Sequence, residues 1–162
     1  MAVNIHIKID SIPGMSMIEG FADQIQIESF SWGMNQTTNF SASAGGGAGK
    51  VAVSDLSFVH MIDKASPKLI MACCTGQHIK EAILTCRKVD GNAGVDFLKI
   101  TMTDVLISGV TPSGSNAGDT PTESVSLAFA EFKVEYQEQD NKGAKKGGVI
   151  DAKFSIQKNK KL

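Results

Sequence analysis

The residues that most invite a chemical interpretation form a glycine-rich stretch at 45–51, which ends in a lysine and a valine. A phosphate-binding loop of the Walker A type needs glycine at its first position and serine or threonine after the lysine, where the hydroxyl reaches magnesium. Ala44 and Val51 hold those two positions, and residues 51–58 predict a strand where a helix should begin. We therefore expect a hairpin or docking loop here, with no bound nucleotide.

Two adjacent cysteines, Cys73 and Cys74, form a second candidate site with His78, because Cys74 and His78 lie four residues apart. Gly76 falls between them and is predicted to end a helix. Side chains of adjacent helical residues point about 100° apart, so both thiols cannot easily reach one metal ion. The thiols are predicted instead to be small buried hydrophobes, with no metal and no other cofactor.

The remaining polar residues form no recognisable catalytic group. His6 and His60 are not accompanied by a nucleophile, and the sequence has no Gly-x-Ser-x-Gly pattern of the serine hydrolases. Asp55, Asp63 and Asp104 do not make a paired-carboxylate pattern. The sequence thus predicts a protein that is not an enzyme, and a hydrolase with an unrecognised site is the weakest hypothesis.

The composition is that of one ordinary globular domain, predicted to span residues 1–162. A net charge of −1 gives no field that would steer the chain onto nucleic acid or anionic lipid. Lys158, Lys160 and Lys161 are predicted to be a solvated cluster. No apolar run approaches the roughly 20 residues that span a bilayer, so no membrane insertion is expected.

The first residues and the cysteines predict where the protein is made. Residues 2–9 alternate apolar and polar, unlike the continuous apolar region of a Sec signal peptide. Three cysteines, an odd number, suit a reducing compartment. The chain is therefore predicted to begin in the cytoplasm, and any export must use a machine that ignores Sec signals.

Apolar residues that alternate with period two predict a mainly β fold. The predicted strands cover residues 3–9, 23–32, 51–60, 79–89, 95–108, 123–136 and 149–157, with a weaker one at 34–40. The apolar parity changes after Met102 in one strand and after Phe129 in another. Since a slip of one residue turns later side chains to the opposite face, each change predicts a bulge or bend. Long bent strands predict two packed antiparallel sheets that form a barrel.

One short helix is predicted between the strands. Ser66 is expected as its N-cap, Pro67 as its first residue and Gly76 as its end. Asp63 is expected to fix the start of the helix. Its apolar stripe consists of Leu69, Ile70 and Cys73. This stripe predicts that the helix lies against the outside of the barrel.

Three long loops, at residues 41–50, 109–122 and 139–148, are rich in glycine or other small and polar residues. Loops of this length inside a compact domain are usually functional or disordered. Several of them on one scaffold predict a protein that docks another molecule. From the residues alone, this favours a stand-alone β-barrel binding module for a small ligand or a protein partner.

Several short motifs, taken in chain order, make a more specific pattern. They are Met1-Ala2-Val3 with Ile5 and Ile7-Lys8-Ile9, Ser31-Trp32-Gly33-Met34, the glycine-rich residues 45–51, Asp55-Leu56-Ser57-Phe58, residues 62–67, residues 69–73 and residues 122–136. Each motif alone is weak, but the ordered set covers nearly the whole chain. In this order the motifs resemble the Hcp (hemolysin-coregulated protein) family of type VI secretion tube proteins.

The resemblance implies an assembly as well as a fold. It implies a β-barrel flanked by one helix, and six copies in a hexameric ring with a wide polar channel. Such rings stack into a tube inside a contractile sheath, and contraction drives the tube, tipped by a VgrG spike, out of the cell. The rings can also carry small effector proteins in the channel.

The resemblance also implies roles for individual residues. Ser31 matches the serine of the family's Ser-Trp-Gly motif, which faces the channel and influences cargo binding. The family's ring-stacking loop is matched by Ala42, Gly45, Gly46, Gly47, Gly49 and Lys50. Trp32 is expected to pack in the core or between subunits. Residues 15–22 are less polar than the corresponding family loop, which predicts a different outer surface there.

Overall fold

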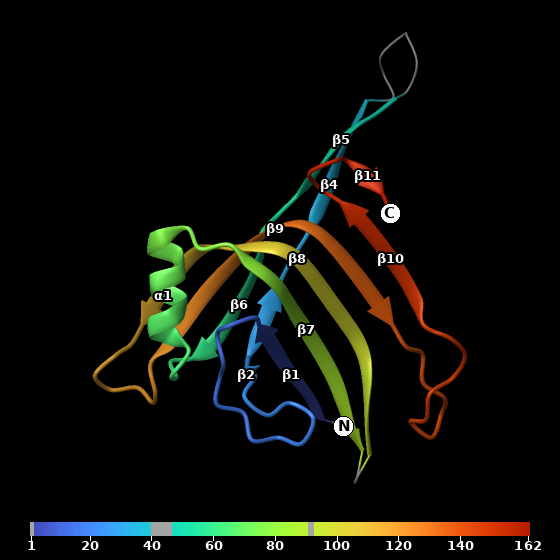
Figure 1. Ribbon diagram of the computed structural model, residues 1–162. Coiled ribbons are helices and arrows are strands. Elements are labelled where there is room, and N and C mark those ends of the chain that lie inside the picture. Colours follow the sequence, from blue (N-terminus) through green and yellow to red (C-terminus); the bar gives the residue numbers. More distant parts are fainter. Residues whose placement is uncertain (1, 40–46, 91–92) are drawn as a thin grey trace.

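Antiparallel strands make up most of the computed structural model, which describes residues 2–39, 47–90 and 93–162. The elements in chain order are β1 (Ala2–Ile9), β2 (Ile25–Gln26), β3 (Ser29–Ser31), β4 (Met34–Asn39), β5 (Gly47–Val53), β6 (Leu56–Met61), α1 (Ser66–Thr75), β7 (Ile79–Asp90), β8 (Ala93–Ser113), β9 (Thr122–Tyr136), β10 (Ile150–Ser155) and β11 (Lys160–Lys161). Figure 1 shows β7, β8 and β9 strongly curved, with α1 beside them and β4–β5 projecting from the opposite end.

Nine of the described strands form one rolled sheet in the order β11-β10-β9-β8-β7-β1-β2, with β3 paired to β6 and β6 paired to β9. One edge of β9 therefore has two neighbours, β6 along residues 122–127 and β10 along residues 131–136. The chain between β2 and β3 links the two ends of the roll, because the Ile27 N–H donates to Ile5 and the Glu28 N–H donates to Val59. The predicted mainly β barrel is confirmed, and its walls belong to one rolled sheet.

The bend that rolls the sheet lies where the sequence predicted the changes of parity. In β8, Met102 is buried before the change and Val105 after it, and Asp104 between them has a φ of 57°. A residue in this left-handed region breaks the alternation of side chains and turns the strand. β9 changes parity beside it, since Leu127 and Phe132 are both buried.

Two predicted strands are each divided in the structure. Residues 23–32 form the short β2 and β3, because the chain between them leaves β1 and joins β6. The predicted strand at 51–60 is interrupted at Ser54 and Asp55, where β5 ends and β6 begins. Both divisions occur where a segment changes its pairing partner, which alternation along the sequence does not encode.

The start of α1 differs from the prediction. Ala65, not Ser66, is the N-cap residue, and no side chain caps the helix. Ser66 is buried as the first helical residue, and its hydroxyl accepts a hydrogen bond from the Asp63 N–H at 3.1 Å. Gly76 ends the helix with a φ of 63°, a conformation that glycine adopts without strain.

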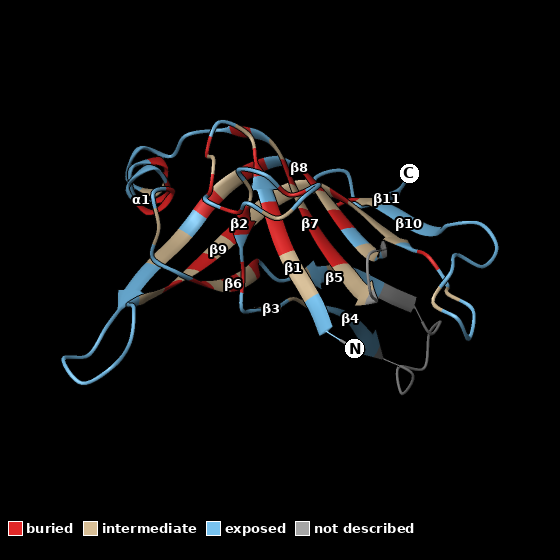
Figure 2. Ribbon diagram, turned by 90° about the horizontal axis from the view of Figure 1, so that it is seen from below, coloured by how far each residue is buried: buried red, intermediate tan, exposed pale blue. Residues whose placement is uncertain are grey.

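The face of α1 that packs on β8 also differs in one position from the prediction. Leu69 and Ala72 are fully buried and Cys73 is half-buried, whereas Ile70 is 39% exposed. Figure 2 shows this buried inner side of α1 together with the buried residues of β1 and β7. Among the described residues, no helix is both long and apolar enough to cross a bilayer.

Candidate functional site

Ser31 lies in a surface of short, uncharged side chains on the side of the sheet that faces away from the core. In the strand register Ser31 is opposite Ser57, and Ser57 is opposite Ser126. Residues directly opposite on antiparallel strands share a face, and the faces alternate along each strand. The register assigns the following residues to this surface, which we call the hydroxyl face: Ser29, Ser31, Ser57, Val59, Met61, Leu106, Gly109, Thr111, Ser113, Thr122, Ser124, Ser126 and Ala128.

A side-chain contact and a packed core support the hydroxyl face. The Oγ atoms of Ser57 and Ser126 are 3.0 Å apart, within hydrogen-bonding distance. On the core side of the same strands, Phe58 and Val125 are essentially fully buried. Ser31 itself is exposed at the end of β3. The face is therefore a rigid wall of small side chains backed by a packed core.

Beyond the bend at Asp104, the same side of the sheet carries charged side chains. We call this surface the charged face, and it consists of Glu81, Lys99, Glu131, Lys133, Glu135, Asp151 and Lys153. Along β9 the sign of the charge alternates, and the Lys133 Nζ lies 3.6 Å from the Glu135 Oε1. The outer side of one sheet is thus divided into an uncharged part and a charged part.

The β4–β5 ribbon carries the described part of the predicted ring-stacking loop. Gly47, Gly49 and Lys50 belong to β5, whereas Ala42, Gly45 and Gly46 lie outside the described residues. Among the described residues, these two strands pair only with each other. A two-stranded ribbon is marginally stable alone, so its attachment to the barrel matters.

Hydrogen bonds at the base of the ribbon provide that attachment. The Ser54 hydroxyl accepts from the Gly33 N–H at 3.0 Å and donates to the Gly33 carbonyl at 2.9 Å. The Ser54 N–H donates to the same carbonyl, and the Trp32 Nε1–H donates to the Ser54 carbonyl at 3.0 Å. These bonds fix the direction in which the ribbon leaves the barrel.

Trp32 packs against aromatic residues of its own subunit. Its ring lies edge-on to Phe132 at 4.9 Å between centroids and is tilted against Phe129 at 5.9 Å. Phe154 of β10 extends this cluster, because its ring is tilted against Phe132 at 6.0 Å between centroids. A further contact of Trp32 with a neighbouring subunit stays a prediction.

A buried polar pair that the sequence analysis missed joins β6 to β9 near the start of α1. The His60 Nε2 lies 2.9 Å from the Glu123 Oε1, and both side chains are fully buried. The Asp63 Oδ1 accepts from the Ala65 N–H at 2.8 Å, and its Oδ2 lies 3.9 Å from the His60 Nδ1. Both His60 and Glu123 sit at apolar positions of alternating strands, and that position is the signal that could have revealed them.

Residues 10–24 are held against β1 and β7 by a second polar cluster. The His6 Nε2 lies 3.1 Å from the Ser16 Oγ, and the His6 ring stacks on Phe21 at 4.3 Å. The Arg87 guanidinium covers the other side of Phe21 and also binds Asp96 at 2.6 Å. Burial, together with the nearby Arg87 charge, lowers the pKa of His6, so this ring is kept neutral.

The thiols do not share one environment. Cys86 is buried in the core, and burial raises its pKa to about 11. Cys73 is half-buried, but Cys74 is exposed, which corrects the expectation that both would be buried. The turn of about 100° between adjacent helical residues points Cys74 away from β8. Within the described residues, no three His, Cys, Asp or Glu side chains are grouped to hold a metal ion.

Comparison with known proteins gives a consistent set of relatives. A family model described as "Type VI secretion system effector, Hcp" matches residues 6–136. Protein hcp1 of Pseudomonas aeruginosa is 45% identical over 159 residues, which is 98% of this chain and 98% of that protein. The crystal structure of Hcp1 from Salmonella typhimurium is 39% identical with a TM-score of 0.82, covering 100% of both chains. A structure described as a type six secretion system protein is 30% identical with a TM-score of 0.92, covering 99% of this chain and 100% of that one.

Proposed function

The chain belongs to the Hcp family of type VI secretion system proteins, and on this premise we infer that it is the structural subunit of the secretion tube. Six copies form a ring, the rings stack into a tube, and the tube is secreted and can carry small effector proteins. The observation that supports this function best is the hydroxyl face, a continuous uncharged wall on a rigid sheet.

The hydroxyl face has the properties that a cargo channel needs. Its short side chains leave the channel open, and its hydroxyl groups stay hydrated without adding charge. A wall without net charge neither repels nor traps a folded protein of either sign. We assign this face to the channel, with Ser31 in contact with cargo.

A tube subunit has three further classes of partner besides copies of itself. These are the VgrG-type spike at the tip, the contractile sheath around the tube and the small effector proteins inside it. The protein leaves the cell with the tube. Its role is that of a carrier and a structural part, not of an enzyme.

The alternative of a stand-alone barrel that holds a ligand gains no support from the interior. The centre of the roll is filled by side chains that are at most 1% exposed, among them Phe58, Leu84 and Met102. A ligand-binding barrel of this size needs an internal cavity. Electron microscopy of the purified protein separates the two functions, because particles without a central hole at every concentration would exclude the tube subunit.

Ser31→Gln tests the assignment of the channel wall. The longer side chain should leave the rings intact, because Ser31 is exposed and its side chain makes no contact with the core. Retention of a co-purified small effector should change several-fold. Ala144→Gln, in the exposed segment between β9 and β10 and away from the hydroxyl face, is the control and should change nothing. Loss of rings in the Ser31 variant would show that this residue lies in a subunit interface instead.

A further inference from the structure

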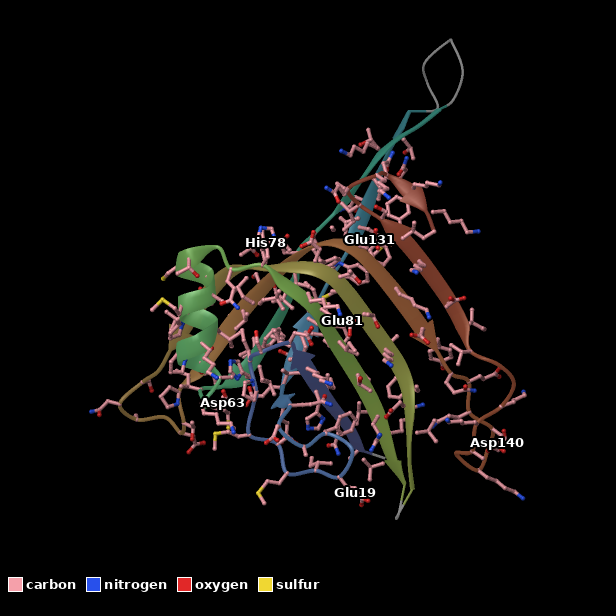
Figure 3. The ribbon with its side chains drawn as sticks, in the orientation of Figure 1. Glu19, Asp63, His78, Glu81, Glu131 and Asp140 are labelled. Carbon is pink, nitrogen blue, oxygen red and sulfur yellow. The ribbon has the colours of Figure 1, made fainter. Side chains whose placement is uncertain are left out.

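We propose that residues 10–24, which we call the strap, detach from the barrel as one unit when His6 takes up a proton. The subunit thereby carries an acid-sensitive switch outside its hydrophobic core. Figures 1 and 3 show the strap as the chain between β1 and β2, with Glu19 on it. All the contacts involved lie within one subunit, so the switch does not depend on the proposed function.

The strap, and not the core, buries His6. In β1 the side chain of Ile7 belongs to the core, and alternation turns His6 to the outer side of the sheet. His6 is nevertheless 0% exposed. Phe21 of the strap stacks on its ring at 4.3 Å between centroids, and Phe21 is itself buried although it lies outside the main core cluster. Opening the strap therefore returns His6 to water.

The strap is folded mostly on itself. In the described structure, the backbone–backbone hydrogen bonds of residues 13–24 all join two residues of this range. The Gly14 N–H donates to the Asp23 carbonyl at 2.7 Å. The Ser16 N–H donates to the Gln24 carbonyl at 3.0 Å. A Cβ atom at Gly14 would collide with the Gln24 carbonyl, so the two sides of the strap lie close together. Compact loops of this kind open as units, without unfolding the elements that they connect.

Side chains of β1 and β7 hold the strap to the sheet. The Ser16 Oγ lies 3.1 Å from the His6 Nε2. The Arg87 Nη1 donates to the Glu19 carbonyl at 3.3 Å, and the guanidinium lies over Phe21 at 4.2 Å from the ring centroid. The rings of His6 and Phe21 and the Arg87 guanidinium thus form one stack, with His6 at its base.

Two further contacts of the strap involve backbone N–H groups. The Asp10 N–H donates to the Glu81 carbonyl at 3.1 Å, and the Lys64 N–H points to the Met15 sulfur at 3.4 Å. Neither contact gains or loses a proton in mild acid. Of these described contacts, that of His6 is therefore the one that changes between about pH 5 and 8.

A second proton on the His6 ring has no place in the closed strap. Neutral imidazole has one N–H, and the protonated ring has two. The Nε2 atom is engaged by Ser16, whereas the Nδ1 atom is buried without a hydrogen-bond partner among the described residues. The positive charge would also lie near Arg87. Burial and this neighbouring charge lower the pKa of His6, and the burial exists only while the strap is closed.

No neighbouring carboxylate of the described chain offsets that charge. His6 takes part in none of its ion pairs, and the carboxylate of Asp96 is already bound to Arg87 at 2.6 Å. The residues opposite His6 on β2 and β7 are Gln26 and Thr85, which are uncharged. The charged residues at the edge of the strap are Lys8, Asp10, Glu19 and Asp23. The proton therefore destabilises the closed strap and is tolerated in the open one.

The pH dependence follows from the difference between the two forms. The open strap gives His6 its ordinary pKa of about 6.5, and the closed strap gives it a lower pKa. Because the open form binds more protons, the closed form is fully stable above about pH 6.5 and loses stability as the pH falls below that value. With no proton on the closed form, the open population rises about 30-fold at about pH 5. Since Hcp proteins are secreted, the strap can respond to an acidic medium outside the cell.

Hydrogen exchange in the full-length protein measures the opening. The exchange rates of its amides at about pH 5 and about pH 7.5 are each divided by the rates of the unfolded chain at the same pH. Protection of residues 13–24 should fall about 10- to 30-fold at the lower pH. Protection of β8 and β9 should change by less than about two-fold, because their pairing with each other does not involve the strap.

Two glutamine variants assign the effect to His6. His6→Gln takes up no proton in this range and keeps an amide that can bond to Ser16, so the pH dependence of strap protection should fall below about two-fold. His78→Gln is the matched control, because His78 is 75% exposed and lies outside the strap. It should leave the wild-type dependence intact.

Nuclear magnetic resonance of the histidine rings in the wild type provides a second measurement, which decides the matter where His6→Gln does not fold. The His6 signal should change over the same pH range as the protection of the strap.

The outcomes separate the switch from the proposed function. Equal strap protection at both pH values would overturn the switch. A His6→Gln variant that keeps the acid sensitivity would also overturn it, as would a His6 signal that does not follow the loss of protection. Equal losses in the strap, β8 and β9 would show global unfolding in place of a local opening. Absence of rings at neutral pH would overturn the proposed function and leave the switch standing.

Discussion

The hydroxyl face and the charged face lie on the same side of the same sheet, yet they are built from different residues. The hydroxyl face pairs serine with serine across β3, β6 and β9. The charged face places Lys133 directly opposite Lys153, and Glu135 directly opposite Asp151. Like charges directly opposite each other destabilise a strand pair. The hydroxyl face is thus free of like-charge pairs. The charged face sets opposite charges across β8 and β9, where Lys99 is opposite Glu135, but like charges across β9 and β10.

This difference shows which positions of the sheet the fold does not constrain. On the core side both regions need large apolar residues, and Leu127 and Met102 are both fully buried there. On the outer side no packing within the subunit constrains the type of residue, so the function of the surface can determine it. A surface that must hold unrelated cargo benefits from small uncharged residues, and a surface that faces solvent benefits from charge.

Glu123→Ala and Glu135→Ala should give the largest contrast between the two regions. Glu123 lies beneath the hydroxyl face, and its removal leaves His60 buried without its 2.9 Å partner. Leaving a buried polar group without its partner costs about 1–3 kcal/mol of the free energy of unfolding. Glu135 makes a surface ion pair, whose loss costs about 0–1 kcal/mol. Urea unfolding at equal protein concentration measures both, and equal losses would contradict the comparison.

Asp104 tests whether the boundary between the two faces is a property of the backbone. Its φ of 57° is disfavoured for β-branched residues, so Asp104→Val should destabilise by about 1–2 kcal/mol. Asp104→Gly loses the same exposed contact with His78 but tolerates the angle, and should be neutral or slightly stabilising. Thr101→Val on the same strand is the control. If valine and glycine at position 104 behaved alike in thermal unfolding, the bend would not depend on this residue.

Much of the fold was readable from the sequence because alternation reports burial directly. The changes of parity after Met102 and Phe129 predicted the bend, and Gly76 predicted the end of α1. Pairing partners were not readable, because residues such as His60 and Glu123 are brought together only by the register of β6 with β9. For the same reason the sequence did not predict the division of the outer side into two faces. The role of Ser31 was predicted only from the resemblance to the family.

The smallest expected effects concern the contacts within each face. Ser57→Ala removes the 3.0 Å contact with Ser126 and should cost about 0.5–1 kcal/mol, because a neutral hydrogen bond adds little net stability. A double-mutant cycle with Ser126→Ala should recover most of this as coupling. The equivalent cycle of Lys133 and Glu135, which are 3.6 Å apart, should give a coupling of about 0.2–0.5 kcal/mol that disappears at high salt. If the coupling energy on the charged face were as insensitive to salt as that on the hydroxyl face, the comparison would be wrong. The charged side chains would then be held by contacts within the subunit that salt does not screen.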